Sequence, residues 1–153
     1  ADVAEYFKVK ASSILLVDEN RKTLEFVASY GLSESYLNRG TLTVDKGVQE
    51  TLAGHPVAIL DVSTDERAHH KMEKEREGIV SLLSIPVKAE DKVLGVLRLY
   101  SGTPREFTEE EILMGSVLAQ LGGLAIQNAS LYLMLESDVK DLRENTWSYR
   151  SWF

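Results

Sequence analysis

The most regular alternation of apolar and polar segments lies between Gly78 and Phe107. Two apolar segments, Ser81–Lys88 and Val93–Tyr100, flank a short polar run at 89–92. Apolar and β-branched runs on either side of a tight polar turn are typical of a β-hairpin. A long helical pattern follows at once, so the sequence predicts a hairpin that leads into a last helix.

Two more strands are predicted near the start of the chain. The segment Ile14–Val17 is apolar on both faces, as in a central strand that is covered on both sides. The next segment, Thr23–Gly31, alternates between apolar and polar residues. One of its faces would carry Leu24, Phe26, Ala28 and Tyr30. This face is expected to fix the register of the strand.

The middle of the chain predicts shorter elements. A short helix is expected over Val48–Ala53, ended by Gly54, and a strand follows from Val57. Residues 65–77 are almost wholly charged, and only Ala68 and Met72 stand at helical spacing to anchor them. We therefore expect a weakly held helix or a mobile lid there.

The last helix has the clearest start signal in the chain. Thr108 stands three residues before Glu111, the spacing of a capping box, and Glu109 and Glu110 suit the positive end of the helix dipole. The Gly122-Gly123 pair lowers helix propensity, which indicates close approach to another helix or backbone.

Beyond Thr108 the apolar residues follow a heptad spacing. The predicted seam consists of Leu121, Leu124, Asn128, Leu131, Leu135, Asp138 and Leu142. A helix of more than thirty residues is longer than a domain of this size needs, so its far half requires another surface. A parallel homodimer would supply it, with Asn128 pairing with its twin. In the alternative, Asn128 faces solvent and the helix packs along its own sheet.

This order of elements resembles the GAF domain family. The resemblance rests on Ser81, Pro86, Gly95 and Leu97 at these spacings, with FTEEE at the helix start. Further matching segments are ASSILLVD, TLEFVASYG, GVQETLAGHP and VAILD, and together they cover about residues 3 to 135. The resemblance implies an α/β (α+β) fold, with a five- or six-stranded antiparallel sheet, helices on both faces and a long C-terminal helix. It also implies a regulatory sensor module.

Composition narrows the classes of function. The chain has 153 residues and a formal net charge of -7, which argues against direct nucleic-acid binding. No apolar run approaches the roughly 20 residues of a membrane-spanning helix, and no basic-then-apolar leader opens the chain. We therefore expect a cytoplasmic protein with no membrane partner in this segment. Because cysteine is absent, there is no thiolate nucleophile, no Cys-ligated zinc and no thioether-linked chromophore such as a covalent bilin.

Little in the sequence indicates catalysis. There is no GxSxG elbow and no phosphate-binding glycine motif. The members of the family that reduce free methionine sulfoxide work through cysteines, which this chain lacks. His69 and His70 are adjacent, so on a helix they would not easily ligate one metal, and neither haem nor another metal is favoured. His55, before Pro56, is expected to be a turn residue. We expect no enzyme activity and propose no catalytic residue; turnover by a standalone enzyme would have to rest on a bound metal or these histidines.

Arg98 stands in the middle of a predicted strand, where a charge needs a partner or a route to water. It would serve either as an anion-binding arm inside a ligand pocket or as a snorkelling or salt-bridged arginine near the sheet edge. The resemblance places a pocket wall on the middle strands and the short helix. The residues it nominates are Tyr30, Leu52, Ile59, Ser81, Leu83, Arg98 and Tyr100. The residue set that binds cyclic nucleotides in part of the family is matched only faintly, by Phe107 and Glu111, so that ligand is not favoured.

These patterns predict a sensor domain over residues 1–135, its first helix truncated, and a helical extension over 136–153 toward an output domain. An unidentified small molecule would change the sheet and the charged segment, and the dimeric helix would transmit the change. The rival prediction is a ligand-free dimerisation module whose core is filled by its own side chains. An apolar cavity with Arg98 or Tyr100 pointing into it would favour sensing, and a solid core would favour the scaffold.

Overall fold

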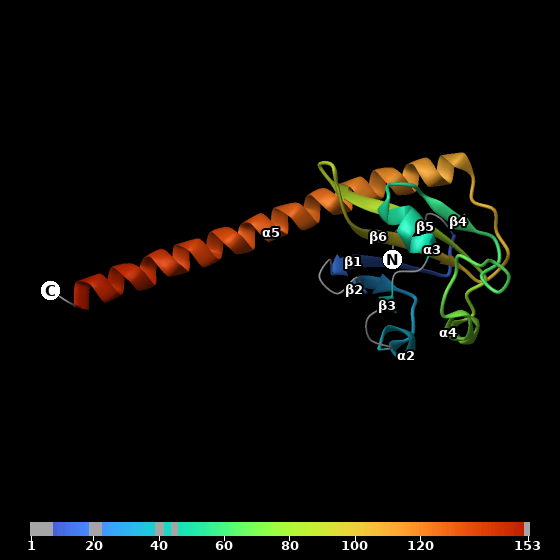
Figure 1. Ribbon diagram of the computed structural model, residues 1–153, viewed down its shortest axis with the longest axis horizontal. Helices are drawn as coiled ribbons and strands as arrows, with labels where there is room; N and C mark the ends of the chain where they lie inside the picture. The colour runs from blue at the N-terminus through green and yellow to red at the C-terminus, as the bar shows by residue number, and fades with distance from the viewer. Residues whose placement is uncertain (1–7, 19–22, 39–41, 44–45, 152–153) are drawn as a thin grey trace.

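The structure is a computed structural model that describes residues 8–18, 23–38, 42–43 and 46–151 (Figure 1). The helix expected near the N-terminus lies outside these residues. The strands are β1 (Ala11–Asp18), β2 (Thr23–Tyr30), β3 (Leu42–Thr43), β4 (Val57–Ile59), β5 (Ser81–Ala89) and β6 (Lys92–Ser101). The helices are α2 (Glu34–Leu37), α3 (Lys46–Leu52), α4 (Lys71–Glu77) and α5 (Glu109–Ser151).

The strands form one six-stranded sheet in the order β3-β2-β1-β6-β5-β4. Each neighbouring pair in this order is antiparallel. The predicted hairpin is present as β5 and β6, and β1 is a central strand as its two apolar faces predicted. The expected α/β architecture, an antiparallel sheet with helices and a long C-terminal helix, is confirmed.

The two faces of the sheet are covered by different elements. On the α5 face, helix α5 packs on Leu83, Ile85 and Val87 of β5 and on Leu97 and Leu99 of β6. On the α3 face, residues of α3 pack on Leu15, Leu24 and Val96. The same face continues into a second cluster around Tyr100, Leu82 and Ile59. Because successive residues of a strand point to opposite sides, Leu97 and Arg98 belong to different faces.

Strand β2 does not keep the single face that its alternation predicted. Leu24 is fully buried and Phe26 packs on the core, but Ala28 is exposed and Tyr30 is 44% exposed. The cause is a bulge: Leu15 pairs with Phe26 and Ile14 pairs with Ala28, which leaves Val27 as an extra residue. An extra residue reverses the faces of all that follow it, so the prediction of a common face was wrong beyond Phe26.

The charged segment before β5 is anchored differently from the prediction. Helix α4 begins only at Lys71, after His70 in a left-handed conformation with a φ of 56°. Ala68 is buried as expected, but Met72 is 65% exposed. The buried residue of α4 is Lys74, whose Nζ donates a hydrogen bond to the carbonyl oxygen of His69. A lysine stem covers apolar surface as a methionine would, which the residue type alone did not indicate.

Helix α5 is 43 residues long and begins at the predicted capping box. The Thr108 N–H donates to a Glu111 carboxylate oxygen at 3.0 Å, and the Glu111 N–H donates to the Thr108 hydroxyl at 3.1 Å. The first part of α5 lies along the sheet, and the remainder extends well beyond it as a rod (Figure 1). The prediction of an unusually long final helix is therefore confirmed.

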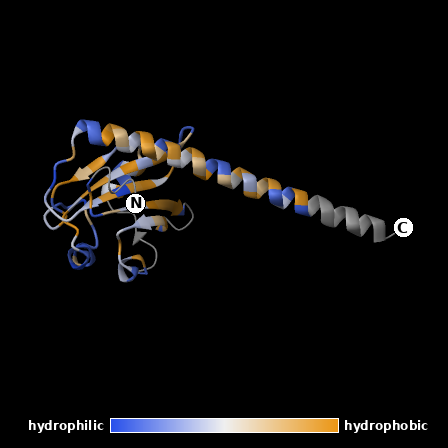
Figure 2. Ribbon diagram, turned by 180° about the vertical axis from the view of Figure 1, so that it is seen from behind, coloured by the Kyte–Doolittle hydropathy of each residue, from blue (hydrophilic) through white to orange (hydrophobic). Residues whose placement is uncertain are grey.

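Hydrophobic residues recur along α5, both where it lies on the sheet and beyond it (Figure 2). Ile112, Ala119 and Ile126 face the sheet. Residues two positions apart on a helix are rotated by about 200° about its axis, so Leu121 lies on the side opposite Ala119. The exposed seam residues are Leu121 at 57%, Leu124 at 47%, Leu131 at 52% and Leu135 at 63%, with Asn128 and Asp138 also exposed. The side chain of Leu142 lies outside the described residues.

By length and composition alone, residues 109–140 of α5 would also suffice to cross a membrane. Core helices of soluble proteins meet the same criterion when they are mostly buried, whereas only 17% of the apolar window of this helix is buried. Ala119 and the partly buried Ile112 pack on the sheet. Its apolar residues lie partly on the side packed on the sheet and partly on a second side that is largely exposed among the described residues.

Candidate functional site

The α3 face carries a buried polar row across its three central strands. Arg98 of β6 pairs with Ser13 of β1 on one side and with Ser84 of β5 on the other. Arg98 is 4% exposed, and the two serines are 2% exposed. The row separates the apolar cluster around Val96 from the one around Tyr100. A positive charge is thus held in the middle of the sheet, between two apolar clusters.

Among the described residues, Arg98 has no counter-charge of the kind that such a position needs. Its Nε is buried without a hydrogen-bond partner, and none of the ion pairs among the described residues includes it. Strand β6 lies between β1 and β5, far from either sheet edge. The alternative of a snorkelling or salt-bridged arginine at the edge is therefore wrong. The first alternative, an anion-binding arm inside a ligand pocket, stays a prediction: Arg98 lies on the α3 face, and the four pockets found among the described residues are lined by other residues.

Next to Arg98 on the same face, Tyr100 is completely buried. Its hydroxyl and the Ser13 hydroxyl share a hydrogen bond of 2.7 Å. The ring of Tyr36, from α2, packs edge-on against Tyr100 with 6.4 Å between ring centroids, and against Phe26 at 6.1 Å. Tyr36 thus closes the α3 face over Tyr100, in the direction of solvent.

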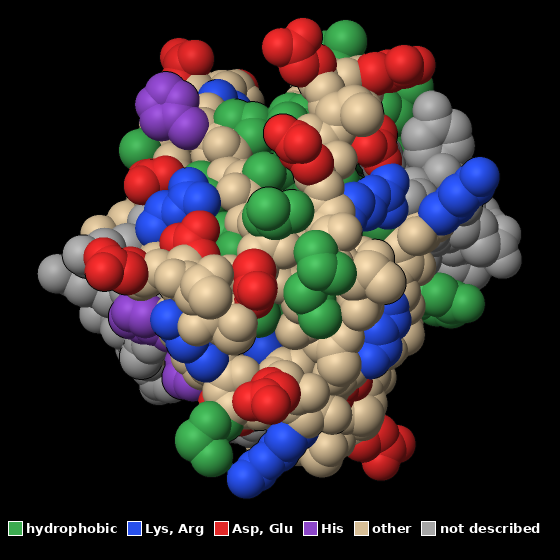
Figure 3. All heavy atoms as spheres, turned by 90° about the vertical axis from the view of Figure 1, so that its right-hand side faces the viewer, with side chains coloured by type: hydrophobic (Ala, Val, Ile, Leu, Met, Phe, Trp, Pro, Cys, Tyr) green, Lys and Arg blue, Asp and Glu red, His purple; other side chains and the backbone are tan. Residues whose placement is uncertain are grey.

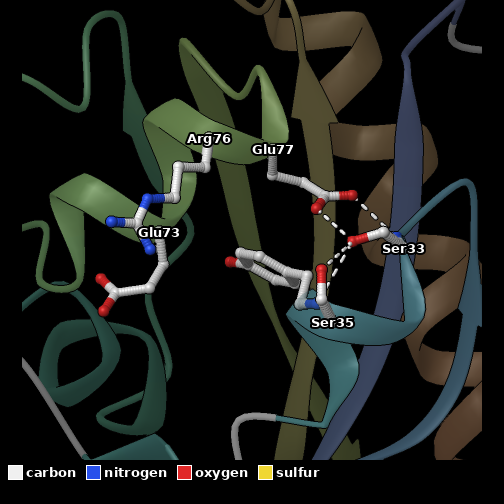
Figure 4. Close-up of a pocket in the computed structure, with 6 residues that line it drawn as sticks. Ser33, Ser35, Glu73, Arg76 and Glu77 are labelled. Atoms are coloured by element: carbon white, nitrogen blue, oxygen red, sulfur yellow. Dashed lines mark hydrogen bonds between the residues drawn. The ribbon is translucent and has the colours of Figure 1, made fainter.

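Outside Tyr36 lies a pocket of about 500 Å³ between α2 and α4 (Figure 4). Its lining consists of Ser33, Ser35, Tyr36, Glu73, Arg76 and Glu77. The Glu77 carboxylate accepts hydrogen bonds from the Ser33 N–H at 2.7 Å and from the Ser33 hydroxyl at 2.6 Å. In Figure 4 Glu77 points toward Ser33, while Glu73 and Arg76 extend on the other side. The Ser33 and Glu77 contact ties α2 to α4 across the pocket.

The structure places the seven nominated pocket residues on two faces. Leu52, Ile59, Arg98 and Tyr100 all belong to the α3 face, where they pack in or between its two apolar clusters. Leu83 packs against α5, and Ser81 stands on the same side of β5 by alternation. The Ser81 hydroxyl donates to the Thr103 carbonyl oxygen at 2.8 Å. Tyr30 stands after the β2 bulge, opposite Ser12. Their ligand-binding role stays a prediction.

Sequence reasoning missed the residues that enclose this face. Tyr36 follows a loop after β2 and shows no periodicity, although its N-cap Ser33 is a recognisable start signal. Glu77 is one of many charged residues in its segment, so nothing marked its contact with Ser33, which lies 44 residues away in the chain. Such partners are visible only once the fold brings them together.

The loop before α4 has its own polar network. A hydrogen bond from the Ser63 hydroxyl, aided by the Ser63 N–H, holds the pKa of Asp61 below its ordinary value. The Arg67 guanidinium, hydrogen bonded to Asp65, lowers the pKa of that carboxyl. Arg67 also donates to the Ala58 carbonyl oxygen of β4 at 3.1 Å, which fastens the loop to the sheet.

Acidic side chains stand at the top of the view in Figure 3, and acidic, basic and single apolar side chains are interspersed below them. In the described part of the chain, no three His, Asp or Glu residues are arranged to hold a metal ion.

Comparison with known proteins identifies the family. Residues 1–127 match the model of a GAF domain family. The chain is a GAF domain. No curated protein matches it in a sequence search. The recognition made from the hairpin, the capping box and the flanking segments is therefore confirmed.

The GAF domain is similar to several solved structures. A domain of a two-component sensor histidine kinase from Sinorhizobium meliloti has 26% identity and a TM-score of 0.74, with coverage of 88% of this chain and 90% of that one. The GAF domain of an Acinetobacter phosphoenolpyruvate-protein phosphotransferase has 26% identity and a TM-score of 0.71, with coverage of 85% and 78%. These relationships place the chain among sensory and regulatory GAF domains.

A more distant neighbour shares the fold alone. It is a type II free methionine-R-sulfoxide reductase from Thermoplasma acidophilum, with 16% identity, a TM-score of 0.66 and coverage of 83% of this chain and 89% of that one. The same fold therefore carries both regulatory and enzymatic roles, and fold alone does not distinguish them.

Proposed function

We propose that this GAF domain senses a small molecule on the α3 face of its sheet and passes the change to an output domain through α5, paired with α5 of a second copy. The supporting observation is that β5 and β6 contact both sides. Leu97 and Leu99 of β6 pack on α5. Arg98 and Tyr100, which alternate with them along the strand, face the α3 side. A shift of β6 on ligand binding would therefore move the surface on which α5 rests.

Pairing of α5 is proposed because, among the described residues, a row of leucines on its outer side stays largely exposed. Leu121, Leu124, Leu131 and Leu135 stay about half exposed or more, at the spacing of a coiled-coil seam. A cysteine at a seam position of a parallel dimer lies next to its twin. Because the chain has no cysteine of its own, a disulfide between two copies can form only between the introduced cysteines.

The pairing is tested by oxidative crosslinking of Leu131→Cys, with Leu133→Cys as the matched control. Both leucines are exposed, at 52% and 63%, but only Leu131 belongs to the seam. We expect Leu131→Cys to form the disulfide dimer at least about tenfold faster, because only its thiols would lie within bonding distance. Equal rates, or a monomer by sedimentation equilibrium, would contradict the pairing.

Sensing is tested by native mass spectrometry of protein purified without denaturation, which should contain a bound small molecule. A spin label on Ser137→Cys would then report the distance between paired helices before and after that molecule is removed. A changed distance is expected from the relay. An unchanged distance with the molecule lost would contradict it.

The second candidate is a dimerisation scaffold without a ligand. It is favoured by the closed contact between Tyr100 and Ser13, because the phenol is already hydrogen bonded and fully buried. The scaffold predicts protein of unaltered mass together with the same crosslinking of Leu131→Cys. We expect neither candidate to have enzyme activity.

A further inference from the structure

Arg98 is 4% exposed, and its buried Nε has no hydrogen-bond partner among the described residues, which bears on the chemical class of ligand that this face could bind. Arginine keeps its positive charge inside proteins, so, unlike a buried lysine, it does not escape the cost of burial by losing a proton. An unpaired buried charge is strongly unfavourable, and it persists where something else compensates for it. Among the described residues, Nε of Arg98 has no acceptor and no ion pair includes the side chain, so the protein itself supplies no charged partner there.

The surroundings of Arg98 suit an oxyanion. The side chains paired with it across the sheet are Ser13 and Ser84, both 2% exposed, and hydroxyl groups donate readily to anionic oxygens. The planar guanidinium presents parallel N–H groups that match a carboxylate or a phosphate. Tyr100, one position further on this face, contacts Tyr36, which lines the solvent pocket. Tyr36 therefore lies between that pocket and Tyr100.

We propose that the α3 face binds a small molecule bearing a carboxylate or phosphate group, with that group held by Arg98 and flanked by the hydroxyls of Ser13 and Ser84. This rests on the proposed sensing function and adds the class of ligand to it. The charge of Arg98 is thus neutralised only when the ligand binds. Without the anion, the folded domain is less stable than it would be with an apolar residue at position 98.

The test measures the melting temperature of the intact chain in sodium phosphate, sodium succinate and neutral succinamide, at a sodium concentration kept constant with chloride. The variants are Arg98→Met, Arg98→Lys and Arg76→Met. Without anions, Arg98→Met is expected to melt about 2–4 °C or more above the wild type, because it removes an unpaired buried charge. A residue with only a structural role would give a lower melting temperature.

With phosphate or succinate, the wild type is expected to gain about 5–10 °C at roughly 100 times the dissociation constant. Arg98→Met should lose this gain and Arg98→Lys should keep part of it. Any general salt effect of phosphate appears equally in all variants and is subtracted. The difference between phosphate and succinate tells which oxyanion is preferred. The Nε–H signal of Arg98 in NMR spectra should shift with the same anion.

Three results would overturn the proposal: a lower melting temperature for Arg98→Met, a gain that Arg76→Met abolishes and Arg98→Met keeps, or no gain with either anion. The absence of a gain with either anion can be distinguished from failure of the sensing function. If a neutral molecule is found bound and changes the α5 distance, the function stands and only the anionic class is wrong. If no molecule of either charge changes that distance, the sensing function fails as well.

Discussion

A β-carbon added to Gly123 of α5 would overlap the backbone carbonyl oxygen of Lys88 at the end of β5. The helix therefore lies directly on the backbone of the hairpin at this point, which only glycine permits. A β-carbon added to the neighbouring Gly122 would meet no atom of the described residues within 4 Å. The sequence prediction of a close approach is confirmed for Gly123 and does not hold for Gly122 within one chain.

Replacement of Gly123 by alanine is expected to lower the free energy of unfolding by about 1–3 kcal/mol, because helix and hairpin must separate to admit the methyl group. Gly122→Ala is the matched control. It should raise stability by up to about 1 kcal/mol through higher helix propensity. Urea denaturation of both variants measures the difference. Equal effects would mean that α5 does not rest on Lys88.

The capping box at the start of α5 predicts a dependence of stability on pH. Burial raises the pKa of Glu111, but the Thr108 N–H, the charge of Arg105 and the hydroxyl of Thr108 outweigh it, so the pKa lies below its ordinary value of 4.5. A lowered pKa in the folded state stabilises the fold above the unfolded pKa. This contribution should be lost as the pH falls below about 4.5 and through the folded value.

Glu111→Gln should remove that part of the acid dependence, as measured by urea denaturation between pH 3 and pH 7. Glu110→Gln, at an exposed position one residue earlier, is the control and should keep it. Thr108→Ala should cost about 1 kcal/mol at neutral pH through loss of the N-cap. An identical pH profile for Glu111→Gln and the wild type would contradict the role of the carboxylate.

The sequence predictions were correct where the interactions that decide a feature join residues close together in the sequence. The β5 and β6 hairpin, the Thr108 and Glu111 capping box and the length of α5 are set by neighbours in sequence, and each was predicted. The placement of Tyr30 failed because the bulge at Val27 depends on pairing with β1, and a bulge leaves no sign in the alternation of β2 itself. One extra residue then moves every later side chain to the other face.

The candidate site was predicted in part for the same reason. Arg98 stood out because a charge in an apolar strand violates a local rule, and such violations mark sites worth examining. Ser13 and Ser84 break no rule in their own segments. Their meaning depends on lying opposite Arg98 on two other strands, which requires the strand order and register.

The contact between Ser33 and Glu77 should control how readily α2 and α4 separate over the pocket. Glu77→Ala removes both acceptor oxygens, and we expect the amides of both helices to exchange with solvent several-fold faster. In a double-mutant cycle with Ser33→Ala, the coupling should be about 0.5–1.5 kcal/mol. Glu75→Ala, on an exposed side of α4, is the control. Equal exchange in both variants would show that the contact does not hold the helices together.

Asn128 stands at the seam of α5, where a polar residue would favour a two-stranded, in-register pairing at some cost in stability. Asn128→Leu is therefore expected to strengthen self-association, since each buried leucine contributes about 1.5–3 kcal/mol, which lowers the dissociation constant at least tenfold. It should also admit species larger than a dimer. Gln127→Leu adds the same apolar side chain one residue away from the seam. It should change neither the dissociation constant nor the number of chains in the assembly. Sedimentation velocity over a range of concentrations distinguishes these outcomes. If both variants behave like the wild type, Asn128 faces solvent and the paired helix requires a different seam.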